Sequence, residues 1–243
     1  MPRIISEVTP TIEQRLAGWV TIHERQVAGA GTRQRPTLTI SREFGCEGFP
    51  LAARLKELLD ESTGESWTIF DRALIEMVAE DAVVTPRVLR HLGDMPRAFE
   101  AVGFHAEGTT LTQDAVYQKI VRCLVPIARA GNAIIVGRGG AVLCQGLENC
   151  FHFRLIASLD WRAQSYARRM DMSVDDARRA VVELSEMRTS FLNRNLGTDI
   201  ADPKHYDAIF SNERRSIDEI ARAIVGHVRS AWRVKELFQA AGV

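Results

Sequence analysis

TISREFGCEGFPLAARLKELL, residues 39–59, carries the strongest structural signal in this chain. A short β-branched run leads into a turn that contains Gly45 and Gly48, and a helical pattern follows. Glycines let a turn point its N–H groups inward, and the start of the next helix adds the positive end of a dipole. The arrangement is typical of a strand, a phosphate-binding turn and a helix.

The turn departs from the usual phosphate-loop pattern G-x-x-x-x-G-K-[ST]. In the same register Arg42 takes the place of the first glycine, and Gly48 takes that of the lysine. Phe49 and Pro50 stand where a hydroxyl residue would hold Mg²⁺. The pattern alone leaves two interpretations open: a phosphate site without its lysine, or a turn that needs glycine for steric reasons and binds nothing.

The composition is that of a globular protein with one large domain. The chain has 243 residues, of which 46% are hydrophobic and 26% charged. Lys and Arg together number 31, as do Asp and Glu, so no basic field attracts nucleic acid. No stretch resembles a signal peptide or approaches the ~20 apolar residues that span a bilayer. We expect a cytoplasmic protein that binds neither nucleic acid nor a membrane.

The four cysteines and six histidines show no metal-ligand spacing, because neither C-x-x-C nor H-E-x-x-H occurs. We expect reduced thiols. Cys46 lies inside the glycine turn, where we expect a small packing side chain. The alternative is a reactive thiol, since a helix N-terminus lowers the pKa of a nearby cysteine.

Beyond Pro36, short β-rich runs alternate with longer helical patterns. This alternation predicts an α/β fold with a parallel sheet, helices on both faces, and ligands at the carboxyl ends of the strands. The expected strands cover residues 37–41, 67–70, 133–137, 152–157 and 207–212. The expected helices cover residues 48–61, 72–82, 113–130, 138–145, 159–170, 173–195 and 216–240. Residues 1–35 are expected to form an N-terminal helix and a linker ahead of the main domain, residues 36–240.

Several segments together resemble the cytidylate kinase-like family, a branch of the P-loop nucleoside-monophosphate kinases. The glycine turn resembles the family's T-I-S-R-E-[FY]-G-x-x-G opening. Later segments resemble its [FY]-D-R, G-R-G and D-P-x-x-Y-D motifs. These segments are IFDRALIEMVAED (69–81), IIVGRGGAVL (134–143) and DIADPKHYDAIFSN (199–212).

The resemblance implies a three-layer P-loop NTPase fold, with a five-stranded parallel sheet of order 2-3-1-4-5 and a helical lid. It implies an acceptor-side insertion at about residues 72–130 and a lid at about residues 160–200. It also implies a Mg²⁺-dependent transfer of the γ-phosphoryl group of ATP to a nucleotide or related small acceptor.

Phosphoryl transfer depends on positioning and on neutralising the charge of the transferred group. The resemblance places ATP phosphates on the turn, at Ser41, Gly45, Cys46, Glu47, Gly48 and Phe49. Arg42 is the nearest cation and would stand in for the lysine, as a planar fork rather than a point charge. The alternative for Arg42 is an ion pair with Glu43 or Glu47.

Three residues at strand ends are the expected acceptor ligands. Asp71 and Arg72 follow the second expected strand, and Arg138 follows the third. Asp71 would also hold Mg²⁺ through water. The alternatives are a helix N-cap at Asp71 and a structural turn arginine at Arg138. Met77 occupies the place of an acceptor-binding arginine in orthodox cytidylate kinases, so the resemblance does not identify the acceptor as cytidine monophosphate.

The segment expected to form the lid is rich in arginine. The arginines are Arg162, Arg168, Arg169, Arg178, Arg179, Arg188 and Arg194. Most are expected on solvated helix faces. Arg188 and Arg194 come nearest to the family's lid pattern R-D-x-x-D-x-x-R, so they are the expected catalytic arginines together with Arg42.

Two classes of function remain open. The first is an ATP-dependent kinase whose partners are a nucleotide donor and a small-molecule acceptor. The second is a catalytically degenerate nucleotide-binding or protein-interaction module on the same fold, because the usual lysine and metal-binding hydroxyl are absent. Apolar stripes on the first and last expected helices are compatible with a homodimer.

Overall fold

The computed structural model describes residues 35–71, 74–75 and 113–241. The expected N-terminal helix, most of the expected helix 72–82 and the predicted acceptor ligand Arg72 lie outside these residues.

Five strands form one parallel sheet in the order β2-β3-β1-β4-β5, as the resemblance implies. The central strand pairs on both sides: Thr39 lies opposite Ile135 of one neighbour and His152 of the other. The strands are β1 (Thr37–Arg42), β2 (Thr68–Phe70), β3 (Ala133–Val136), β4 (Cys150–Ile156) and β5 (Ala208–Ser211).

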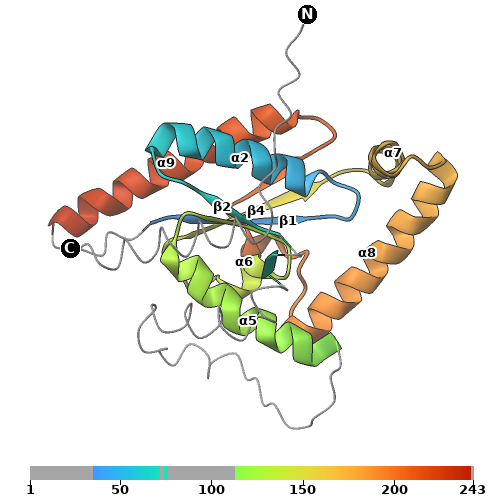
Figure 1. Ribbon diagram of the computed structural model, residues 1–243, viewed down its shortest axis with the longest axis horizontal. Helices are drawn as coiled ribbons and strands as arrows, with labels where there is room; N and C mark the ends of the chain where they lie inside the picture. The colour runs from blue at the N-terminus through green and yellow to red at the C-terminus, as the bar shows by residue number, and fades with distance from the viewer. Residues whose placement is uncertain (1–34, 72–73, 76–112, 242–243) are drawn as a thin grey trace, which may run out of the picture.

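Helices cover both faces of the sheet and complete the three layers (Figure 1). The described helices are α2 (Gly48–Thr63), α5 (Gln113–Ala130), α6 (Gly140–Leu143), α7 (Leu159–Met170), α8 (Val174–Leu196) and α9 (Ile217–Ala241), with a 3-10 turn η2 (Pro203–His205). Helices α2 and α9 lie on one face, and α5 and α6 lie on the other. Helices α7 and α8 form a hairpin beside the sheet, in the segment predicted as the lid.

Strands β2 and β3 are fully buried and β4 nearly so, and these three strands are mainly apolar, whereas the edge strand β5 is only partly buried. Leu38 and Ile40 of β1 pack in one core with Leu51 of α2. Ile135 of β3 packs in the other core with Leu124 of α5. The later part of the expected acceptor-side insertion is therefore a helix whose apolar side faces the sheet. Within the described residues, no helix is long and apolar enough to cross a membrane.

The start expected for the helix 216–240 is confirmed, whereas the start expected for the helix 138–145 is wrong. Ser216 and Glu219 form a capping box, in which each backbone N–H donates to the other side chain, at 2.9 and 3.3 Å. The expected helix 138–145 is shortened to Gly140–Leu143. Arg138 and Gly139 have φ angles of 55° and 72°, which a right-handed helix does not contain.

Candidate functional site

The glycine turn joins the central strand to the first core helix, and Gly45 sets its shape. Gly45 has a φ of 99°, in the region that favours glycine. A β-carbon at this position would lie 2.7 Å from Cβ of Arg162. Both the backbone conformation and the close approach of α7 therefore require glycine here.

Side chains of α7 hold the carbonyl groups of the turn. Arg162 Nη1 donates to the Phe44 carbonyl at 3.1 Å, and Arg169 Nη2 donates to the Gly45 carbonyl. The Phe44 ring packs on Tyr166 of the same helix, with centroids 5.2 Å apart. Two of the arginines from the predicted lid thus shape the turn through its oxygens.

Several N–H groups of the turn remain available to an anion. Cys46 N–H donates to the Glu43 carbonyl at 3.2 Å, and Glu47 N–H donates to Asn212 Oδ1 at 2.8 Å. The remaining amides have no hydrogen-bond acceptor within the described residues, and they belong to Phe44, Gly45, Gly48 and Phe49. The donor set is therefore smaller than the continuous run that the sequence suggested.

Cys46 is a packing side chain of the turn, as expected. It is buried in the core that also contains Leu51 of α2. Burial, and then the negative charge of Glu43, raise the pKa of its thiol to about 12. Both effects favour the protonated thiol, so they support the packing role over the alternative of a reactive cysteine.

Three of the expected arginines meet at the carboxyl ends of β1 and β3. A β-carbon on Gly137 would lie 2.2 Å from Arg42 Nη1 and 3.0 Å from Arg188 Nη2. Two guanidinium groups, one from β1 and one from α8, therefore lie against the same glycine. Arg138 is the next residue, and its charge acts on both of them.

The residues Arg42, Arg138 and Arg188 form an arginine cluster, in which burial and mutual repulsion destabilise the charges of Arg42 and Arg188. Burial and the Arg138 cation lower the pKa of Arg42 to about 10, from an ordinary 12.5. Burial also lowers the pKa of Arg188, and the charges of Arg42, Arg138 and Arg154 lower it further. Within the described residues, neither Arg42 nor Arg188 forms an ion pair with a carboxylate. A bound anion would stabilise both cations.

The alternative ion pair of Arg42 with an acidic residue of the turn is not formed. Glu43 Oε2 lies 3.6 Å from Arg162 Nε, and Glu47 Oε1 accepts a hydrogen bond from the Ser165 hydroxyl at 3.3 Å. Both carboxylates therefore face α7. Glu47 contributes a side chain that links the turn to the hairpin.

Arg154 is a fourth arginine beside the cluster, and it is not among the residues predicted from the sequence. It is buried in β4, and its Nη1 donates to the Ile200 carbonyl at 2.8 Å and to the Tyr206 hydroxyl at 3.2 Å. The Tyr206 hydroxyl donates to the same carbonyl at 2.6 Å and lies 3.1 Å from Ser41 Oγ. The available sequence signal was a charge within the apolar run HFRLIA (152–157).

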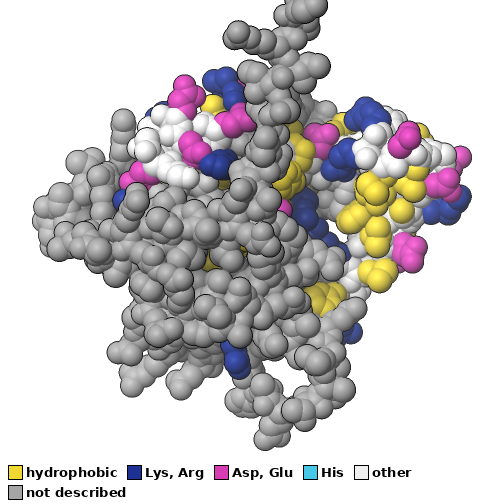
Figure 2. All heavy atoms as spheres, in the orientation of Figure 1, with side chains coloured by type: hydrophobic (Ala, Val, Ile, Leu, Met, Phe, Trp, Pro, Cys, Tyr) yellow, Lys and Arg dark blue, Asp and Glu magenta, His cyan; other side chains and the backbone are white. Residues whose placement is uncertain are grey.

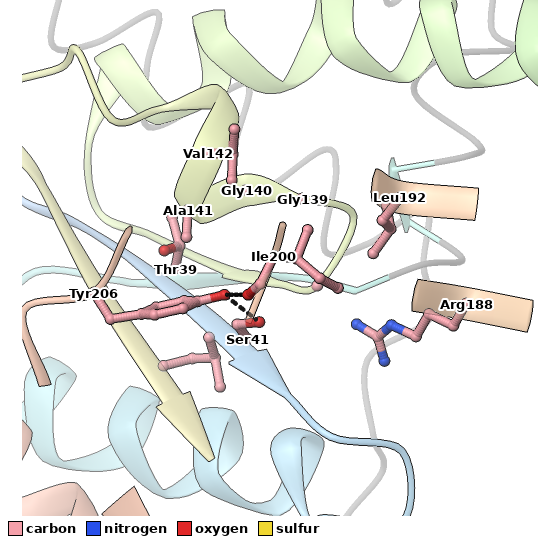
Figure 3. Close-up of a pocket in the computed structure, with 12 residues that line it drawn as sticks. Thr39, Ser41, Gly139, Gly140, Ala141, Val142, Arg188, Leu192, Ile200 and Tyr206 are labelled. Carbon is pink, nitrogen blue, oxygen red and sulfur yellow. Dashed lines mark hydrogen bonds between the residues drawn. The ribbon is translucent and has the colours of Figure 1, made fainter. Parts of the chain in front are cut away.

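A hollow of about 290 Å³, partly open to solvent, lies beside these arginines (Figure 3). Small residues of the 137–142 turn line it, together with Ser41 and Tyr206. Arg188 projects toward it from α8. In the space-filling view, Lys and Arg side chains gather in the recess between the body of the domain and the α7–α8 hairpin (Figure 2). Cations beside a hollow of small residues suit an anionic ligand.

Arg138 has a strained backbone. Its φ of 55° lies in the left-handed region, between Gly137 at 80° and Gly139 at 72°. A residue other than glycine in this region costs on the order of 1–3 kcal/mol, and such strain concentrates at functional sites. Glycine would be less strained at position 138, so the arginine side chain carries a conformational cost here.

Asp71 caps the helix start that follows β2, as the structural alternative predicted. Its Oδ1 accepts from Leu74 N–H at 3.0 Å, and its carbonyl accepts from Ile75 N–H at 3.1 Å. The described residues contain no group of three potential metal ligands. Magnesium is commonly held by one or two carboxylates and by substrate phosphates, so a single Asp71 carboxylate fits a metal that arrives with a nucleotide.

The remaining lid arginines lie away from the cluster. Arg194 is exposed in the last turn of α8. A helix turns by about 100° per residue, so Arg194, six positions after Arg188, faces roughly 120° away from it. Arg178 and Arg179 form surface ion pairs with carboxylates. The structure thus brings Arg188, but not Arg194, to the cluster.

The profile of the cytidylate kinase-like family matches residues 37–214, which is most of the chain. The chain belongs to this family. No curated protein matches the sequence. Among solved structures, an uncharacterized protein from Eubacterium ventriosum has a TM-score of 0.62 at 18% identity, covering 81% of this chain and 99% of that one. At this identity the likeness supports the fold alone.

Proposed function

We propose that the protein is an ATP-dependent phosphotransferase that moves the γ-phosphoryl group of ATP to a nucleotide or a related small acceptor. The arginine cluster carries this proposal. Arg42 and Arg188 lie against Gly137 without a carboxylate partner among the described residues. Transfer of a phosphoryl group spreads negative charge over its oxygens, and such cations stabilise that charge.

The glycine turn would bind the phosphates of ATP. The N–H groups of Gly45, Gly48 and Phe49 would donate to phosphate oxygens, with Ser41 at the end of β1 beside them. Arg42 would supply the positive charge that a lysine supplies in other phosphate loops. Cys46 and Glu47 would act through the shape of the turn, since their own N–H groups are used within the protein.

The acceptor would bind on the other side of the cluster. Arg138 would hold the acceptor phosphate, and Arg188 would contact the transferred group from α8. An acceptor phosphate is ionised at neutral pH, so it requires no neighbouring general base. Asp71 would hold Mg²⁺ through water, and the metal would screen charge between the phosphates.

A nucleotide-binding module without turnover is the second candidate, and the start of α2 favours it. The Phe49 side chain is 49% exposed where a hydroxyl residue would hold Mg²⁺. Pro50 follows, so neither position offers a metal ligand. Such a chain would still bind phosphate through the turn and through Arg42.

Calorimetric titration with ATP and Mg²⁺, then with nucleoside monophosphates, together with an assay for ADP release, separates these candidates. Binding with acceptor-dependent ADP release supports the kinase, whereas binding without ADP release supports the module. No binding by the folded protein contradicts both. Arg178→Ala is a matched control for Arg188→Ala, because Arg178 lies on the same helix in a surface ion pair.

A further inference from the structure

Arg42 and a side chain at position 48 would compete for the same volume. A β-carbon on Gly48 would lie 2.9 Å from Arg42 Cδ and 3.1 Å from its Nε. Real β-carbons essentially never lie within 3.0 Å of another heavy atom. Any side chain at position 48 would therefore point into the path of the Arg42 side chain.

The backbone gives no other reason for glycine at position 48. Gly48 begins α2, and it is absent from the residues with positive φ. Alanine at such a position is ordinarily the better helix former. The space occupied by Arg42 is thus the feature that excludes a side chain.

A second glycine, Gly137, lies against the guanidinium group of Arg42. The β-carbon of a residue at Gly137 would lie 2.2 Å from Arg42 Nη1. Gly48 thus borders the stem of the arginine, and Gly137 borders its guanidinium group. The Arg42 side chain runs between them toward Arg188.

We propose that Gly48 and Gly137 form a slot that presents the Arg42 guanidinium to phosphate. Glycine at the usual lysine position thereby allows Arg42, from the preceding strand, to replace that lysine. This inference rests on the proposed function. Lysine at position 48 and arginine at position 42 are alternative ways to place one cation, and they exclude each other. Gly48 and Gly137 are positioning residues, whereas Arg42 contacts the ligand.

The test is a double-mutant cycle of Arg42→Ala and Gly48→Lys, with inorganic tripolyphosphate and ATP as calorimetric probes. Each single change is expected to weaken tripolyphosphate binding roughly 10- to 100-fold, the usual range for a lost charged hydrogen bond. The double variant is expected to bind within about tenfold of the wild type, because lysine enters the vacated volume. Independent sites would instead give the product of the two losses.

Gly146→Lys is the matched control, because it adds the same charge in an exposed turn with open space around it. Its tripolyphosphate binding is expected to equal that of the wild type. Losses that simply multiply in the double variant overturn the slot but leave the proposed function standing. A folded wild type that binds neither probe overturns both.

Thermal unfolding without ligand tests the shared volume independently of binding. Gly48→Ala is expected to lower the melting temperature in the presence of Arg42 and to lower it much less, or raise it, in the Arg42→Ala background. Both backgrounds share the same change in helix propensity, so the difference isolates the contact with Arg42. An equal effect in both backgrounds overturns the slot.

Discussion

An arginine lies near each end of β1, Arg35 just before the strand and Arg42 as its last residue. Only Arg35 forms an ion pair with a carboxylate among the described residues. At the amino end, Arg35 donates from Nε and Nη2 to Glu65 at 2.7 and 2.9 Å, and Asn132 donates to the same carboxylate at 2.6 Å. At the carboxyl end, Arg42 has no carboxylate partner among the described residues, and its pKa is lowered to about 10.

The difference suggests a way to distinguish a structural arginine from a candidate ligand-binding one. Both residues are arginines next to the same strand, but only Arg35 has a carboxylate acceptor, Glu65, from the chain itself. The carboxyl ends of parallel strands are where such sheets bind ligands. The uncompensated arginine there supports the proposed anion site, whereas the compensated arginine at the opposite end joins Glu65 to β1.

The largest expected effect tests the carboxyl end. Arg188→Ala should lower kcat/KM for phosphoryl transfer by roughly 10³-fold or more, as loss of a transition-state arginine does. Steady-state ADP release measures this, with Arg178→Ala as the control that should retain activity. A loss of less than tenfold would mean that the cluster is not where charge develops.

Ligand-free stability compares the two ends directly. Arg35→Ala should lower the free energy of unfolding by about 1–2 kcal/mol, because it removes hydrogen bonds to a carboxylate. Arg42→Ala should leave that free energy unchanged or raise it, because it relieves repulsion from Arg138. Urea unfolding of both variants without nucleotide measures the difference. Equal destabilisation would abolish the distinction between the two ends.

At Arg138, the effect of backbone strain on stability can be measured separately from the effect of the side chain on acceptor binding. Arg138→Gly should be more stable than Arg138→Ala by about 1 kcal/mol, since alanine keeps the left-handed strain that glycine lacks. Both variants should lose acceptor binding to the same extent. Chemical unfolding and titration with nucleoside monophosphates measure the two effects. Unchanged acceptor binding would remove Arg138 from the site.

The smallest expected effect is a pH dependence of stability caused by His152, a buried side chain that can be neutral. Nδ1 of His152 lies 2.8 Å from Thr39 Oγ1, and burial lowers the pKa of the ring below its ordinary 6.5. Below pH 6.5 the unfolded chain binds a proton that the folded chain resists, so stability falls as the pH falls and is level above neutrality.

His152→Asn should remove this dependence while preserving a polar partner for Thr39. Between pH 7 and pH 6, the free energy of unfolding should fall further in the wild type than in the variant. The expected difference is below about 1 kcal/mol. Urea unfolding at the two pH values measures it. Parallel losses in both proteins would show that His152 is not the group responsible. Arginine, unlike histidine, keeps its charge at these pH values, so a bound anion would stabilise the buried Arg42.

Much of the fold could be predicted because each strand is a short apolar run between turns. All five expected strands are present in the order that the resemblance implied. The helix expected from residue 138 begins later because Arg138 and Gly139 have positive φ angles, which leave no trace in hydrophobic periodicity. The start of the expected helix 216–240 was predictable, because the capping hydrogen bonds between Ser216 and Glu219 are local in sequence.

The site was predictable where a residue follows a strand. Arg42 and Arg138 each stand at the carboxyl end of a strand, and parallel strands bring these ends together. Arg154 was missed because its role depends on Tyr206 and Ile200, which are distant in sequence. Arg194 was selected from an approximate lid spacing, but the geometry of α8 turns it away from Arg188.

The hydrogen bonds from Arg162 and Arg169 to the carbonyls of the turn also make its shape depend on a distant part of the chain. They join positions 118 and 124 residues apart. Contacts of such long separation close a large loop of chain, which costs conformational entropy. A nascent chain that ended before α7 would contain every residue of the glycine turn but lack the carbonyl partners that shape it. The shape of the glycine turn therefore depends on side chains that are synthesised long after the turn itself.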